Sequence, residues 1–110
     1  MASLEIEPQQ AQKLLKAGRG AVLIDVREPE EIMVARLEPA QLIPMGSIPS
    51  EFGKLESLAD ETTLLVLCHH GVRSLQVAAW LRERGIENCY SVAGGIDRWS
   101  REIDPDIPRY

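Results

Sequence analysis

Hydrophobic residues along this chain form short runs, and stretches with helical spacing separate them. The two clearest runs lie at residues 21–26 and 63–67. A continuous apolar run of this length is typical of a strand that is covered on both faces of a sheet. Weaker patterns predict further strands at residues 4–6, 41–44 and 88–92.

The intervening stretches place apolar residues at i, i+3 and i+4, which is the spacing of one helix face. Pro8 suits a first helical position, and Gly18 suits the end of the same helix. Further helices are predicted to begin at Pro29 and to cover residues 50–58, residues 74–84 and the surroundings of Ile96 and Trp99. Residues 104–110 hold two prolines, so a regular helix is not expected there.

Strands and helices therefore alternate along the chain. This alternation predicts an α/β fold of three layers, in which helices cover both faces of a central parallel sheet of about five strands. A length of 110 residues fits one domain, over residues 1–110.

Composition and charge exclude some classes of partner. The net charge is −5, from 12 basic and 17 acidic residues, so a general nucleic-acid surface is not expected. No apolar run approaches the roughly 20 residues that a membrane span needs. Residues 1–7 lack the pattern of a signal peptide, so we expect a cytoplasmic protein without nucleic-acid or membrane partners. Nothing in the sequence requires a dimer, and a monomer is expected.

Cys68 is the leading candidate for chemistry, because it ends a predicted strand and opens the loop Cys-His-His-Gly-Val-Arg-Ser. A thiolate is the nucleophilic form of cysteine. Backbone N–H groups of residues 69–74, the start of the next helix and the cation of Arg73 would all stabilise it. Gly71 permits the tight turn that such a loop needs. The pattern predicts covalent catalysis in an anion-binding loop.

The electrophile that such a thiolate attacks could be phosphorus, arsenic or sulfane sulfur. The six-residue turn from Cys68 to Arg73 is narrow and favours a single terminal sulfur over a tetrahedral phosphoryl group. A phosphatase or an arsenate reductase on the same architecture remains an alternative, and so does an inert buried thiol.

Three segments together resemble the single-domain rhodaneses, a family of sulfurtransferases. They are the loop at 68–74, the Leu-Ile-Asp-Val-Arg-Glu segment at 23–28 and the Gly-Gly-Ile-Asp-Arg-Trp segment within 92–99. Residues 103–110 also resemble the end of rhodanese domains fused to sulfur-carrier-activating enzymes. Residues 35–40 depart from the Gly-His-Ile-Pro-Gly-Ala pattern common in the family.

The resemblance implies a rhodanese-like three-layer domain and a reaction cycle. Cys68 would take sulfane sulfur from a donor such as thiosulfate and hold it as a persulfide. The acceptor would be cyanide, a thiol or a sulfur-carrier protein, and no metal or organic cofactor is implied. Arg73 would bind the anionic end of the donor. The loop residues that would hold the terminal sulfur are His69, His70, Gly71, Val72 and Arg73.

Other residues are assigned supporting or structural roles. Ser74, Asp25 and Arg27 are expected to support the loop through hydrogen bonds. A metal held by Cys68, His69 and His70 is not expected, because three consecutive residues rarely converge on one ion. The remaining assignments are Cys89, Trp80 and Trp99 in the core and Arg36 in solvent.

A function of a different class is also compatible with the sequence. The domain could be a regulatory module that binds a partner and catalyses nothing. Such modules typically lack the cysteine that this chain keeps at position 68.

Overall fold

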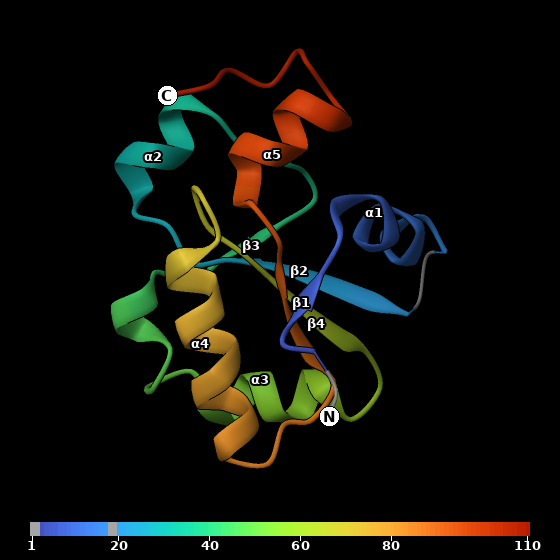
Figure 1. The fold of residues 1–110 in the computed structure, drawn as a ribbon. Coiled ribbons are helices and arrows are strands. Elements are labelled where there is room, and N and C mark those ends of the chain that lie inside the picture. The colour runs from blue at the N-terminus through green and yellow to red at the C-terminus, as the bar shows by residue number, and fades with distance from the viewer. Residues whose placement is uncertain (1–2, 18–19) are drawn as a thin grey trace.

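A five-stranded parallel sheet forms the centre of the computed structural model, which describes residues 3–17 and 20–110 (Figure 1). The strand order is β1-β5-β4-β2-β3, and every neighbouring pair is parallel. The predicted parallel sheet is therefore confirmed, with the two most apolar strands at its centre. The strands are β1 (Glu5–Ile6), β2 (Ala21–Asp25), β3 (Gln41–Leu42), β4 (Thr63–Leu67) and β5 (Cys89–Val92).

Helices cover both faces of the sheet, as the alternation predicts (Figure 1). Leu64 and Val66 of β4 pack with α3 and α4, whereas Leu65 and Leu67 pack with α1 and α5. This division follows from the strand geometry, since successive side chains point to opposite faces. The helices are α1 (Pro8–Lys16), α2 (Pro29–Val34), α3 (Phe52–Ala59), α4 (Val72–Glu83) and α5 (Gly95–Glu102), with a 3-10 turn at Met45–Ser47.

Helix α4 begins at Val72, two residues before its predicted start. The N-cap residue is Gly71 with φ +99°, a conformation that side-chain-bearing residues avoid. This left-handed residue lets the chain turn from the loop directly into the helix. Val72 and Arg73, expected in a free loop, therefore belong to the first helical turn.

The tail beyond α5 contains no regular helix, as expected, and it runs back toward α2 (Figure 1). Gly18, the predicted end of α1, lies outside the described residues. Within the described part of the chain, no helix combines the length and hydrophobicity needed to cross a membrane.

Candidate active site

Cys68 lies at the carboxyl edge of the sheet, one residue beyond the end of β4. Its backbone is held by the start of α5: Ile96 N–H donates to the Cys68 carbonyl at 2.8 Å, and Asp97 N–H donates to the His69 carbonyl at 3.1 Å. A Cβ on Gly95 would collide with both carbonyl groups, and Gly95 has φ +63°. The Gly-Gly turn before α5 is therefore needed for the loop and the helix to approach closely.

Cys68 is 1% exposed, and its sulfur lies at the N-terminus of α4. Gly71 N–H donates to Sγ at 3.1 Å, and Ser74 N–H donates to it at 3.3 Å. The Cys68 thiol itself donates to the Ser74 hydroxyl oxygen, also at 3.3 Å. Backbone amides and the positive end of a helix both stabilise negative charge on sulfur. We call Gly71, Ser74 and Ser91 the sulfur cradle.

Ser91 of β5 is the cradle residue that sequence reasoning missed. Its hydroxyl lies 2.7 Å from the Ser74 hydroxyl, and both side chains are fully buried. The bond holds the Ser74 oxygen in place next to the Cys68 sulfur. A serine in a strand carries no signal of this role, because only the pairing of β5 with β4 brings it beneath the sulfur.

Arg73 is ion-paired with Glu31 of α2. Its two terminal nitrogens donate to the two carboxylate oxygens at 2.6 and 2.8 Å, and both side chains are partly exposed. These hydrogen bonds lower the pKa of Glu31 from 4.5 to about 2. They also raise the pKa of Arg73 above its ordinary value. Glu31 was not singled out from the sequence, since 42 residues separate it from Arg73.

Asp25 and Arg27 form a buried ion pair behind Glu31. Arg27 donates through Nη2 to Asp25 at 2.7 Å and through Nη1 to the Tyr110 hydroxyl at 2.8 Å. The Tyr110 hydroxyl in turn donates to Glu31 at 2.8 Å. These contacts link Asp25, Arg27, Tyr110, Glu31 and Arg73 into one chain, which we call the outer network. Tyr110, at the end of the tail, had no assigned role.

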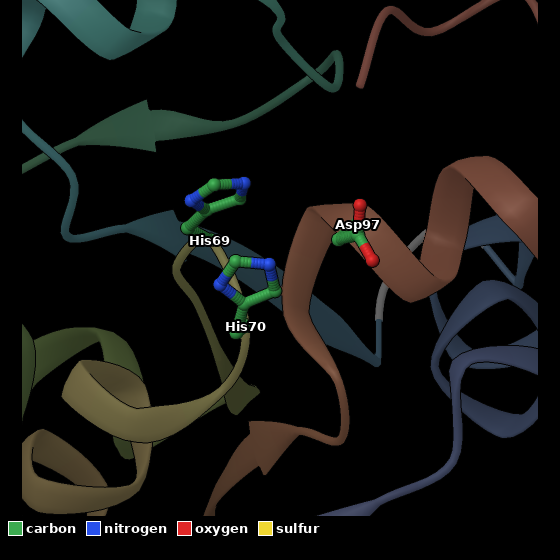
Figure 2. A group of neighbouring side chains, drawn as sticks. All are labelled: His69, His70 and Asp97. Atoms are coloured by element: carbon green, nitrogen blue, oxygen red, sulfur yellow. The ribbon is translucent and has the colours of Figure 1, made fainter. Parts of the chain in front are cut away.

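His69 and His70 follow Cys68 in the loop. Figure 2 shows them next to each other, with Asp97 facing them from the start of α5. The His69 ring stacks on the Tyr110 ring with centroids 3.7 Å apart and on the His70 ring at 3.8 Å. Burial lowers the pKa of His69, and the neighbouring His70 adds to the effect. These contacts tie the loop to the tail.

The ligand atoms of His69, His70 and Asp97 lie within 4.8 Å of one another. The two histidine rings are stacked with an interplanar angle of 28°, so each ring packs against its neighbour. Asp97 is also already paired with Arg109 at 2.9 Å and Arg101 at 3.3 Å. In this structure the three side chains form a packing and ion-pair cluster at the start of α5.

Four residues outside the loop were assigned from the sequence to the core or to solvent. Cys89 is fully buried in β5, and burial raises the pKa of its thiol to about 12. Trp99 is buried as predicted, whereas Trp80 is half-buried and packs edge-on against Phe52. Arg36 is exposed, as expected.

Comparisons with known proteins identify the family. The model of the rhodanese-like domain matches residues 7–102. Rhodanese-like/PpiC domain-containing protein 12, chloroplastic, of Arabidopsis thaliana is 42% identical over 91 residues, which is 82% of this chain and 30% of that protein. The thiosulfate sulfurtransferase GlpE of Haemophilus influenzae is 37% identical over 102 residues, which is 92% of this chain and 91% of that enzyme.

A solved structure gives the same result. The crystal structure of a rhodanese-related protein from Thermoplasma volcanium has a TM-score of 0.79 at 28% identity, over 96% of this chain and 98% of that chain. This likeness confirms the predicted fold. The chain spans 24% to 30% of the length of several curated relatives, the Arabidopsis thaliana protein among them, so in those proteins the matching domain is one part of a larger whole. On the family model and these likenesses, the chain belongs to the rhodanese-like domain family.

Proposed function

We propose that the chain is a sulfurtransferase in which Cys68 carries sulfane sulfur as a persulfide. The observation that carries the proposal is the sulfur cradle. Two backbone N–H groups donate to Sγ at the start of a helix, and the Ser74 hydroxyl lies beside it at 3.3 Å. Such an environment stabilises a thiolate and its persulfide, which are both anions.

The reaction has two steps that balance in atoms and electrons. The Cys68 thiolate attacks the outer sulfur of the donor, an S–S bond forms, and the donor's S–S bond breaks. Sulfite leaves from thiosulfate, or a thiolate leaves from a persulfide, in each case with the bonding electron pair. An acceptor nucleophile then attacks the terminal sulfur and regenerates the Cys68 thiolate. Cyanide becomes thiocyanate, and a thiol becomes a persulfide.

The family and the relative named as a thiosulfate sulfurtransferase support this assignment. A phosphatase or arsenate reductase is less well supported, because those reactions need an arginine that can clamp an oxyanion with both nitrogens. Here both terminal nitrogens of Arg73 already bind Glu31.

Turnover assays test the proposal. Thiocyanate formation from cyanide is measured with thiosulfate and with glutathione persulfide as donors. Cys68→Ala is expected to abolish turnover, whereas Cys89→Ser, the matched control, keeps it, because the buried Cys89 thiol is not activated. Equal turnover by wild type and Cys68→Ala would contradict the proposal. A partner that binds both equally, with no turnover by either, would support the non-catalytic module.

A further inference from the structure

The charge around Cys68 is compensated, which is unexpected for a site that binds a small dianion. Arg73 is paired with Glu31, and Arg27 is paired with Asp25. Asp97, the other carboxylate beside the loop, is paired with two arginines. Among the described residues near the loop, the named arginines all have carboxylate partners.

Glu31 is held firmly in this position. Its two oxygens accept four hydrogen bonds, two from Arg73, one from the Tyr110 hydroxyl and one from the Glu28 backbone N–H. With its pKa lowered to about 2, the carboxylate stays negative over the whole working range of pH. A donor that approaches Arg73 therefore meets a fixed negative charge beside the cation, and like charges at such short range oppose binding.

We propose that Glu31 is a specificity-determining residue, which disfavours dianionic donors such as thiosulfate and leaves thiol persulfides as the preferred donor class. This inference rests on the proposed function. The reacting group of a thiol persulfide carries at most one negative charge, whereas thiosulfate carries two next to the reacting sulfur. The loop amides and the start of α4 are sufficient to hold the single charge.

The preferred step is a transfer between thiols. The Cys68 thiolate attacks the outer sulfur of R–S–SH, and the new bond gives Cys68–S–SH. The S–S bond of the donor breaks, and R–S⁻ leaves with the electron pair. No oxidant or reductant is needed, since one persulfide and one thiolate are exchanged for another pair.

The test compares Glu31→Gln with Glu30→Gln. Both variants remove one negative charge from α2, but only the first removes the carboxylate that neutralises Arg73. Values of kcat and KM are measured with thiosulfate and with glutathione persulfide. In Glu31→Gln, KM for thiosulfate is expected to fall about tenfold, as removal of a close like charge implies. The change with glutathione persulfide is expected to be under about twofold.

The salt dependence of kcat/KM is a second measurement. It would not change if Glu31 only stabilised the fold. In Glu31→Gln, kcat/KM for thiosulfate is expected to fall as NaCl screens the freed Arg73 charge. Wild type and Glu30→Gln are not expected to show this fall. A thiosulfate KM and salt response in Glu31→Gln equal to those of Glu30→Gln, with persulfide formation intact, would overturn the inference alone.

Wild type itself also reports the preferred donor class. If Glu31→Gln does not fold, wild type alone decides, through a kcat/KM for glutathione persulfide well above that for thiosulfate. A preference for thiosulfate would overturn the inference. If wild-type Cys68 gains sulfur from neither donor, the proposed function fails, and the inference fails with it.

Discussion

On its inner side, the Cys68 sulfur accepts hydrogen bonds from Gly71 and Ser74, which lie three and six residues further along the chain. On its outer side, Arg73 is held by Glu31, 42 residues away, and Glu31 by Tyr110, 79 residues away. The inner side is buried, and the outer side is partly exposed. The comparison indicates that the reactive sulfur depends mainly on local geometry, whereas donor selectivity depends on long-range contacts.

Gly95→Ala is expected to have the largest effect on the inner side, because its Cβ would collide with the carbonyls of Cys68 and His69. We expect a loss of about 3 kcal/mol in the free energy of unfolding, from strain and overpacking together. Urea unfolding measures the change. Gly53→Ala is the matched control: its Cβ would meet nothing within 4 Å, and alanine should stabilise α3 by about 0.5–1 kcal/mol. Equal stability of Gly95→Ala and wild type would show that this close approach does not constrain the loop.

Arg73→Ala tests the outer side. It removes the cation and leaves Glu31 unpaired, so kcat/KM for thiosulfate is expected to fall more than about tenfold. The loss of stability should stay near 1 kcal/mol or below, because the ion pair is partly exposed. Steady-state kinetics and urea unfolding separate the two effects. Arg36→Ala, which removes an exposed arginine paired with Glu38, should change neither by much. Unchanged thiosulfate kinetics in Arg73→Ala would refute its role toward anionic donors.

Ser91→Ala tests the inner side, where we expect a smaller effect. Without the Ser91 hydroxyl, the Ser74 hydroxyl loses the bond that holds it next to Sγ. We expect Cys68 alkylation by iodoacetamide to slow by about fivefold, since a neutral hydrogen bond contributes about 1 kcal/mol. Ser100→Ala is the control, because it removes another buried serine hydroxyl, bonded to the Ile107 carbonyl. Equal alkylation rates in the two variants would remove Ser91 from the cradle.

The Arg73–Glu31 ion pair should also make the free energy of unfolding depend on pH in a specific way. Arg73 lowers the pKa of Glu31 from 4.5 to about 2, so the folded state favours the carboxylate. Its contribution is complete above pH 4.5 and is lost as pH falls toward 2. The difference in free energy of unfolding between wild type and Glu31→Gln, measured in urea from neutral to acid pH, should therefore shrink over this interval. A difference that stays constant with pH would contradict the pairing.

The sequence predicted those features that depend on neighbouring residues. The apolar run at 63–67 forms β4 over the same residues, since a strand buried on both faces needs an unbroken run. Cys68, Gly71 and Ser74 come together because one turn links them. The start of α4 was placed late, because the left-handed conformation of Gly71 begins the helix at once.

The outer network could not be predicted in the same way. Glu31 lies in the first turn of α2, two residues after Pro29. At that position a glutamate usually caps the N-terminus of its own helix. Tyr110 lies in a tail without periodic pattern, and only the course of that tail back toward α2 brings its hydroxyl to Arg27 and Glu31. Such partners are determined by the packing of distant elements and carry no local signal.

Intact-mass spectrometry tests the central claim most directly. Reduced wild type and Cys68→Ala are incubated with glutathione persulfide and, separately, with thiosulfate, and their masses are recorded before and after addition of cyanide. The account predicts that wild type alone gains one sulfur atom, more readily from the persulfide, and that cyanide removes it. An equal gain on Cys68→Ala, or no gain on folded wild type from either donor, would contradict the assignment of Cys68 as the sulfur carrier.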